Sequence, residues 1–556
     1  MAFQLSPGVN ISEVDLTTVV PSVATTVGGI AGDFAWGPVD EITIISTENR
    51  LAEVFGKPND TTFQHFFTAA NFLAYGSDLR VVRSVTSSAR NAVPAGNTAV
   101  LVKNTVNYTQ NYTSNNATPF VARCPGSLGN SLKVSMVDAN TFSGWVYSGN
   151  FDSAPGTSDY ASDNNSTNDE IHIVVVDEDG KFTGVANTVL ERFGYVSKAS
   201  DAKNSDGSSN YYKNVLNNKS KYIWWGGHPV GTTNWGTAAT GNVSYNVLST
   251  SVTASLAGGV DGTPDAAAIN NSYNLFSNPD SVDVSLIMAG PTTGSTVPNY
   301  LIALAESRKD CVVFVSPEQT DVVDNFGSEA TDITTTAGTY TKSSYAFMDS
   351  GYKYQYDKYN DTYRWVPLNG DVAGLCVRTD QQRDPWFSPA GLSRGVVKNV
   401  IKLAWNPTQA ERDTLYKNGV NPVVTFPGEG TILYGDKTLL NRPSAFDRIN
   451  VRRLFIVLEK SIARAARSSL FEFNDEFTRA AFVNLVEPYL RDVKGRRGIY
   501  DYKVVCDTTN NTAEVIDQNQ FVGDIYIKPA RSINFIQLNF VAVRTGVAFE
   551  EIVGTV

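Results

Sequence analysis

Residues 281–317 have the sequence SVDVSLIMAGPTTGSTVPNYLIALAESRKDCVVFVSP, and this stretch decides the fold class. The near-continuous apolar run that ends at Gly290 predicts a buried strand, and CVVFVSP at 311–317 predicts a second. The segment between them predicts a helix, with Pro298 near its start, where proline is tolerated. Because strands buried on both faces have continuous apolar sequences, this β-α-β unit indicates a parallel sheet.

The chain before this unit has two parts of different character. Up to about residue 90 the pattern is also α/β, with a strand-turn-strand over 27–46, helices in 47–58 and 61–77, and a strand over 79–85. Residues 88–252 are instead rich in Asn, Ser, Thr and Gly, with short strands between polar stretches. They predict a β-rich inserted domain whose loops, such as 107–118 and 161–169, are exposed and tolerate deletion.

An aromatic stretch, GYKYQYDKYNDTYRW, begins at Gly351. Its aromatic residues recur at every second position on either side of a polar turn at 358–361, which predicts a β-hairpin with cross-strand aromatic pairs. Two interpretations remain: structural aromatics, or a platform for a sugar or a nucleic acid. The nucleic-acid alternative also requires a basic groove, because stacking proteins track the phosphate backbone with positive charge.

A long amphipathic helix is predicted from about Asp447. One stripe is apolar and consists of Val451, Leu454, Phe455, Leu458, Ile462 and Ala465. The opposite stripe is basic and consists of Arg453, Lys460, Arg464 and Arg467. This basic stripe is either a solvated face or an electrostatic docking ridge for an acidic partner.

Composition limits the classes of function. A chain of 556 residues allows about three or four domains, and its net charge of −11 argues against a dedicated nucleic-acid binder. The four cysteines lie far apart in the sequence, which predicts free thiols in a reducing cytosol. The first twenty residues have neither the basic nor the apolar region of a signal peptide, and no apolar run is long enough to span a membrane.

Motifs for catalysis and for metal or cofactor binding are missing from the sequence. The three histidines, His65, His172 and His228, lie in different segments without metal-ligand spacing. There is no nucleotide-binding glycine motif and no GxSxG nucleophile motif. The loop that starts at Gly290 could hold an anion at the end of a strand or could be a plain strand-to-helix connection. No catalytic residue, metal or cofactor is therefore predicted.

Several motifs resemble the tail sheath proteins of contractile-tailed phages of the T-even type, over about residues 1–95 and 255–556. Near the N-terminus they are LSPGVNISEV, FAWGP, FGKP and NFLAYGSDLRVVR; later ones are the tyrosine stretch, SPAGLSRG, ILYGDKT, FDRINVRRLF, VVCDTTNNT and PARSINFIQLNFVAV. The inserted region matches weakly, apart from CPGSLGNSLKVSMV. It is also shorter than the two outer domains of the T-even type.

This resemblance implies a structural, non-enzymatic virion protein. Family members stack as six-membered rings in a helical tube around the tail tube, then contract and drive that tube through the host envelope for genome ejection. The implied partners are other copies of the chain, the tail tube protein, the baseplate and the tail terminator, with no nucleic acid and no direct membrane insertion. The implied location is the virion tail, assembled in the host cytoplasm. A glycan-binding adsorption protein is the alternative, and a hydrolase comes third.

The expected fold is a multidomain combination of α/β and α+β parts. Its predicted parts are an N-terminal arm at 1–22, a sheath core at 23–90 and 255–435, a β-rich outer insertion at 91–254, and an inner domain at 436–556. The basic stripe is expected to face the tail tube. Both termini are too extended and apolar to remain alone, so we expect them to add strands to neighbouring subunits. The arm residues are Val9, Ile11, Val14, Ile533, Phe535, Leu538, Phe540 and Val543.

Overall fold

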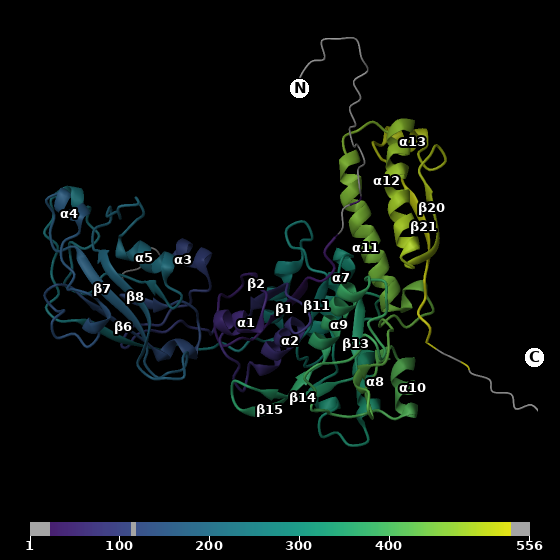
Figure 1. Cartoon of the computed structure of the whole chain (residues 1–556), viewed down its shortest axis with the longest axis horizontal. Coiled ribbons are helices and arrows are strands. Elements are labelled where there is room, and N and C mark those ends of the chain that lie inside the picture. The colour runs from purple at the N-terminus through teal and green to yellow at the C-terminus, as the bar shows by residue number, and fades with distance from the viewer. Residues whose placement is uncertain (1–19, 21–22, 113–117, 535–536, 538–556) are drawn as a thin grey trace, which may run out of the picture. The chain divides into compact units, whose positions relative to one another are not determined.

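The computed structural model describes residues 20, 23–112, 118–534 and 537 (Figure 1). Within it the chain forms two compact units, Met1–Phe473 and Asn474–Val556. Most of the predicted arm residues, namely Val9, Ile11, Val14, Phe535, Leu538, Phe540 and Val543, lie outside the described residues.

A seven-stranded sheet forms the centre of the first unit, in the order β17-β13-β12-β11-β1-β3-β2. Its strands pair in parallel, except that β2 runs antiparallel to β3. Strands from before and after the insertion lie side by side, since β1 pairs with β11. The strands are β1 (Gly28–Gly32), β2 (Thr43–Ile45), β3 (Leu79–Arg83), β11 (Leu286–Met288), β12 (Val312–Val315), β13 (Ala346–Asp349) and β17 (Val420–Asn421).

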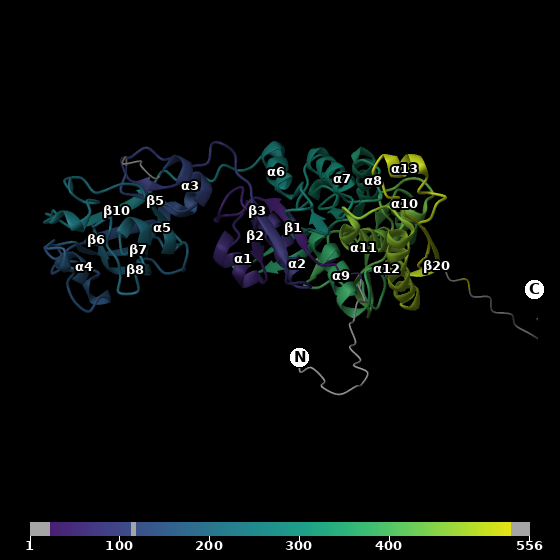
Figure 2. The same cartoon turned by 90° about the horizontal axis from the view of Figure 1, so that it is seen from above.

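Helices cover both faces of this sheet, as Figure 2 shows from above. One face carries α1 (Glu48–Phe55), α2 (Phe63–Leu73) and α9 (Asn369–Gln382). The other carries α6 (Ala266–Tyr273), α7 (Thr296–Arg308), α8 (Glu329–Thr339) and α10 (Gln409–Lys417). The predicted β-α-β unit is confirmed as β11-α7-β12.

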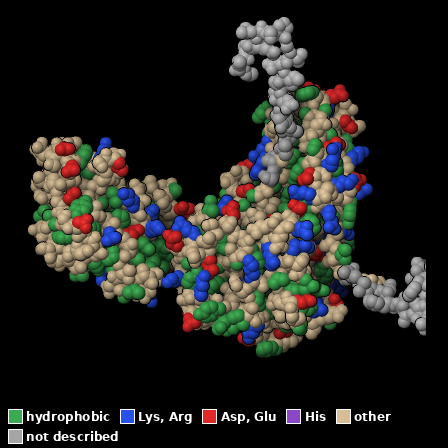
Figure 3. Space-filling view, in the orientation of Figure 1, with side chains coloured by type: hydrophobic (Ala, Val, Ile, Leu, Met, Phe, Trp, Pro, Cys, Tyr) green, Lys and Arg blue, Asp and Glu red, His purple; other side chains and the backbone are tan. Residues whose placement is uncertain are grey.

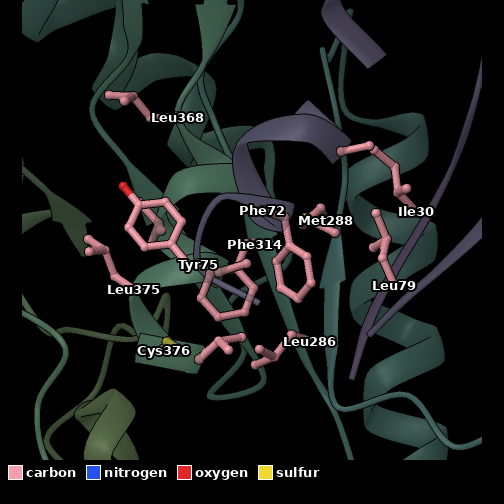
Figure 4. Packing of buried hydrophobic residues seen from close by; sticks show 14 of the residues in the cluster. Ile30, Phe72, Tyr75, Leu79, Leu286, Met288, Phe314, Leu368, Leu375 and Cys376 are labelled. Carbon is pink, nitrogen blue, oxygen red and sulfur yellow. The ribbon is translucent and has the colours of Figure 1, made fainter. Parts of the chain in front are cut away.

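Alternate residues of the buried strands divide between the two cores. Leu286 and Met288 pack with Phe72 and Phe314 under α2 and α9 (Figure 4), whereas Ile287 packs on the opposite side. Both sets are buried, which explains why the strand sequence is apolar without interruption.

Glycines allow α2 and α9 to approach closely. A Cβ atom at Gly370 would lie 2.3 Å from the carbonyl oxygen of Thr68, and one at Gly374 would lie 2.3 Å from the Tyr75 ring. The glycines of the α9 sequence therefore serve helix packing, which in turn places Asp371 beside the tyrosine hairpin.

The inserted region is β-rich, as predicted. An antiparallel sheet in the order β4-β10-β6-β7-β8 contains β4 (Val93–Pro94), β6 (Leu132–Val137), β7 (Glu170–Asp177), β8 (Thr188–Ser197) and β10 (Val252–Ala257). A second pair joins β5 (Phe120–Ala122) to β9 (Ile223–Trp225). The helices of this region are α3 (Thr105–Asn111), α4 (Asp159–Asp163) and α5 (Tyr212–Lys219).

The prediction that its polar loops are freely exposed is wrong at two places. Tyr108 is buried, and its ring stacks on Trp224 with 4.3 Å between centroids. Asp169 is also buried and accepts hydrogen bonds from Ser158 and Ser197. Asn- and Ser-rich sequence here supplies turns that carry internal hydrogen bonds, so deletion of either loop should destabilise the region.

Smaller elements complete the first unit. β14 (Tyr352–Asp357), β15 (Thr362–Pro367) and β16 (Lys402–Leu403) form one sheet, and β18 (Val423–Phe426) pairs with β19 (Gly430–Leu433). Helix α11 (Ile449–Ala466) also belongs to this unit, because Ile449 and Ile456 pack in the core under α9. The second unit therefore begins at Asn474, whereas the sequence pattern placed the boundary at 436.

The second unit is small. It contains α12 (Glu476–Gly495), α13 (Ala513–Asp517), and the antiparallel strands β20 (Ile499–Val505) and β21 (Asp524–Pro529). Strands β20 and β21 pair with each other from Ile499 opposite Pro529 to Val505 opposite Asp524.

Candidate assembly surfaces

The tyrosine hairpin forms with the predicted cross-strand aromatic pairs. Tyr354 lies opposite Trp365, and Tyr356 lies opposite Tyr363. Ring centroids are 4.6 Å apart for Tyr354 and Trp365, 5.5 Å for Tyr354 and Tyr363, and 5.4 Å for Tyr356 and Tyr363. Contacts of this kind between neighbouring rings stabilise the hairpin itself. This favours the structural interpretation.

Near its turn the hairpin has its aromatic side outward and its polar side inward, whereas Tyr352 at its base is buried in the core. Lys353, Gln355 and Asp357 are buried, whereas Tyr356 and Tyr363 are exposed. Figure 3 shows hydrophobic side chains at the edge of the core where Figure 1 labels β14 and β15. The two-residue repeat in the sequence correctly predicted one aromatic and one polar face of the hairpin. It could not determine which of these faces is buried.

Residues from distant segments of the chain form hydrogen bonds with the buried polar side chains of the hairpin. The Lys353 Nζ donates to Asp371 Oδ1 at 2.9 Å and to the Lys398 carbonyl at 2.9 Å. Gln355 accepts a hydrogen bond from Asn71 of α2. Burial lowers the pKa of Lys353, and attraction to Asp371 opposes that shift.

A second buried carboxylate lies at the carboxyl end of β13. Asp349 accepts hydrogen bonds from Ser316 Oγ at 2.7 Å and from the Gly351 N–H at 2.9 Å. Burial raises the pKa of Asp349 to about 8, although these hydrogen bonds act in the opposite direction. The carboxyl ends of the parallel strands are thus filled by a polar network rather than by an open ligand site.

The loop after Gly290 is a plain strand-to-helix connection. The N–H of Gly294 donates to the Glu318 carboxylate at 2.8 Å, and the Gly290 N–H donates to Asn369. A carboxylate in this position repels an incoming anion, so the anion-binding alternative is not supported.

The predicted apolar stripe of α11 is buried, apart from the partly exposed Phe455, but the prediction of an exposed ridge opposite it is wrong for Arg453. The side chain of Arg453 is 4% exposed, and its guanidinium lies 2.6 Å from the Asp380 carboxylate of α9. Arg453 lies on the same side of α11 as Ile449 and Ile456, which pack against the core. A helical wheel cannot show that both sides of a helix are covered.

Two further basic residues of the stripe also pair with acids of the first unit. Lys460 contacts Asp283 at 2.5 Å, and Arg467 contacts Asp280 at 2.8 Å. Arg464 is exposed, and the described part of the chain gives it no ion pair. Contact of these residues with a tail tube stays a prediction. The exposed residues Arg464 and Arg467 can still make such a contact, whereas the buried Arg453 cannot.

The β20–β21 hairpin is the candidate acceptor for terminal arms. Among the described residues these two strands pair only with each other. Phe482, Val486 and Leu490 give α12 a buried stripe, and Tyr500 and Tyr526 of the hairpin are exposed. Ile533, the described member of the C-terminal arm set, is also exposed and lies outside any helix or strand.

One apolar segment was missed by the sequence reasoning. Leu470, Phe471 and Phe473 follow α11 and are exposed, and so is Phe477 at the start of α12. The sequence LFEF between two helices was the available signal, because a connecting segment of that kind is normally polar.

Candidate metal and thiol sites are not supported in the described ranges. No group of three or more His, Cys, Asp or Glu residues there is arranged to hold a metal ion. His65 packs in α2, and burial lowers its pKa to about 4. All four cysteines are free and buried. None of the described helices combines the length and the apolar character that crossing a bilayer requires.

Three family models match successive parts of the chain. They describe the Gp18 domain III N-terminal region of the tail sheath protein at residues 25–83, the phage tail sheath protein central domain at 280–439, and the phage tail sheath C-terminal domain at 441–542. The first two contain strands of the same seven-stranded sheet, on either side of the insertion.

A full-length relative decides the family. The tail sheath protein of Vibrio phage KVP40 is 35% identical, and the match covers 99% of this chain and 100% of that protein. The chain belongs to the phage tail sheath family. The tail sheath protein of Enterobacteria phage T4 is 33% identical to this sheath chain, over 99% of both. The KVP40 alignment spans 673 positions, so that relative carries segments that the 556-residue sheath chain lacks.

Solved structures share the fold at low identity. The sheath tail protein of Desulfitobacterium hafniense matches with a TM-score of 0.55 at 11% identity, over 90% of this chain and 94% of that one. The sheath complex of an extracellular contractile injection system, described in its contracted state, matches with a TM-score of 0.51 at 15% identity, over 97% and 98%. The mixed α/β multidomain architecture is therefore that of sheath proteins.

Proposed function

We propose that this chain is the subunit of a contractile tail sheath. Copies stack as six-membered rings in a helical tube around the tail tube, assemble extended, and contract to drive the tube through the host envelope for genome ejection. The observation that carries this proposal is the 35% identity to a tail sheath protein along nearly the whole chain. The glycan-binding alternative has less support, because the aromatic rings of the hairpin pack on one another.

Strand addition connects the subunits in this proposal. The β20–β21 hairpin has an unpaired backbone edge on each side within the described residues, and such edges accept extended segments through main-chain hydrogen bonds. The arms carry apolar residues at strand spacing, Val9 and Ile11 on the N-terminal side and Ile533 and Phe535 on the C-terminal side. An arm from a neighbouring subunit would complete the sheet at each edge.

Tube docking depends on the exposed end of the basic stripe. Arg464 is available to meet acidic residues of a tail tube, and Arg467 could join it by exchanging its exposed pair with Asp280, whereas Arg453 and Lys460 are held more deeply by Asp380 and Asp283. Exposed charge contacts are screened within about 8 Å at physiological salt, so they can hold register and still release. In this arrangement the insertion at 91–254 projects outward from the tube. Baseplate and terminator proteins bind the two ends of the tube. The tail is assembled in the host cytoplasm and becomes part of the virion.

Electron microscopy of the purified protein tests the polymer. Long tubes support the sheath proposal, whereas monomers or trimers whose mobility changes with added glycans support the adsorption alternative. Deleting residues 2–18 should leave a folded subunit that forms no tubes. A matched pair sharpens this result: Val9→Ser with Ile11→Ser should block tube formation, while Asn10→Ser with Ser12→Ala, on the other strand face, should not. Normal tubes from the deletion would refute strand addition.

A separate charge reversal tests docking. Arg464→Glu leaves the three internal ion pairs of α11 in place, so folding should be unchanged while assembly on tail tubes is impaired. Normal assembly of Arg464→Glu on tubes at low salt would show that this end of the stripe is a solvated face.

A further inference from the structure

The basic stripe of α11 makes a ladder of ion pairs inside the first unit. Arg453, Lys460 and Arg467 are spaced seven residues apart, which places them on one side of the helix, two turns from one another. Their partners come from two separate segments, with Asp380 at the end of α9 and Asp283 and Asp280 before β11. Each rung therefore joins α11 to the part of the chain that surrounds the central sheet.

The rungs of this ladder differ in exposure in a regular order. The side chains are 4% and 5% exposed for Arg453 and Asp380, 13% and 37% for Lys460 and Asp283, and 69% and 73% for Arg467 and Asp280. Water and salt weaken exposed pairs, whereas breaking a buried pair leaves an uncompensated charge in a low dielectric. The contribution of these ion pairs to attachment thus falls from the start of α11 to its end, where Ile462 and Ala465 are still buried.

The first residues after the N-terminal arm are held at the strong end. Thr25 Oγ1 donates to the same Asp380 oxygen that Arg453 contacts, at 2.6 Å. One step along, Lys460 Nζ reaches Ser285 Oγ at 3.3 Å, and that hydroxyl donates to the carbonyl of Ala24 at 3.1 Å. The root of the arm therefore forms hydrogen bonds with the partners of both Arg453 and Lys460, and the Arg453–Asp380 pair is the more deeply buried of the two.

We propose that this ladder is a latch that opens from one end. Arg467 releases Asp280 first and Lys460 follows, so the last turns of α11 can detach from the core. The Arg453–Asp380–Thr25 cluster stays closed and keeps the arm root and the helix start fixed to the core. The inference rests on the proposed function, because a contracting sheath needs subunits that move while staying connected.

Hydrogen exchange of the unassembled full-length subunit tests the latch without requiring tubes. Amides of residues 462–466 should exchange faster than those of 452–458, and raising the NaCl concentration should accelerate only the former, by about fivefold. Arg467→Met should reproduce this acceleration at low salt. Arg464→Met, which removes a charge without a described partner from the same part of the helix, should not.

A cross-link between positions 280 and 467 should hold the latch closed, whereas salt and Arg467→Met should open it. All four native cysteines are buried, so thiols introduced as Asp280→Cys and Arg467→Cys can be joined selectively by a short bismaleimide. The cross-linked subunit should lose the salt-dependent exchange of 462–466. Uniform exchange along α11, equal effects of Arg464→Met and Arg467→Met, or no effect of the cross-link would each overturn the latch. Failure to form tubes would count against the proposed function and leave these measurements unaffected.

Discussion

The β14–β15 hairpin and helix α11 both turn charged side chains inward, but they do so differently. In the hairpin, Lys353 and its partner Asp371 are fully enclosed. In α11, the charged pairs pass from buried at Arg453 to exposed at Arg467. The comparison teaches that an enclosed pair fixes an element in one position, whereas a graded series can hold an element firmly at one end and weakly at the other.

The largest expected effect comes from breaking the enclosed pair of the hairpin. Lys353→Met leaves the Asp371 carboxylate buried without its cation, which should lower the free energy of unfolding by about 3–5 kcal/mol. The urea midpoint of the first unfolding transition measures this loss. Lys358→Met, at the exposed turn of the same hairpin, is the matched control and should cost less than about 1 kcal/mol. Equal losses of stability in Lys353→Met and Lys358→Met would contradict the distinction between enclosed and exposed charges.

The two ends of α11 provide the next test. Arg453→Met should lower the free energy of unfolding by about 3 kcal/mol, because Asp380 keeps only its hydrogen bond from Thr25. Arg467→Met should cost less than about 1 kcal/mol, since its pair with Asp280 is exposed. Urea unfolding of both variants under identical conditions measures the difference. If Arg467→Met lowered the free energy of unfolding as much as Arg453→Met, the proposed decrease in ion-pair strength along α11 would be wrong.

The pH dependence of stability should distinguish the buried carboxyl group of Asp349 from carboxyl groups on the surface. The pKa of Asp349 in the folded protein, about 8, lies above its ordinary value of 3.8. The folded state therefore binds a proton that the unfolded chain has released, and stability falls as the pH rises from about 4 to about 8.

Asp349→Asn should remove this slope. Urea midpoints of the native and variant proteins at pH 5, 6, 7 and 8 should diverge steadily, while Asp324→Asn, at an exposed loop position, should follow the native curve. Parallel curves for Asp349→Asn and the native protein would contradict the assignment.

The smallest expected effect belongs to the outward aromatic row. Tyr363→Ser removes ring contacts with Tyr354 and Tyr356 and should cost about 1 kcal/mol, the typical value for cross-strand aromatic pairs. Thermal unfolding measures the change, and Tyr363→Phe should be close to native because the rings stay packed. A loss matching that of Lys353→Met would mean that the outer face stabilises the hairpin as much as the enclosed pair does.

The sequence by itself determined those features that depend on neighbours along the chain. The apolar runs before Gly290 and after Cys311 predicted two buried strands, since a strand covered on both faces has no polar alternation. The alternation from Tyr352 to Trp365 predicted a hairpin and its cross-strand pairs, because side chains of a strand alternate between faces. Family motifs on both sides of the insertion indicated the sheath fold.

Only the tertiary structure decided which faces are buried and what the charges contact. Lys353 meets Asp371, and Arg453 meets Asp380, because the close packing of α9 brings these acids to the hairpin and to α11. A charged side chain is buried only where a partner offsets its loss of hydration, and that partner can come from any distance along the chain. Periodicity therefore predicts that an element has two faces, whereas three-dimensional packing decides which of them becomes the inside.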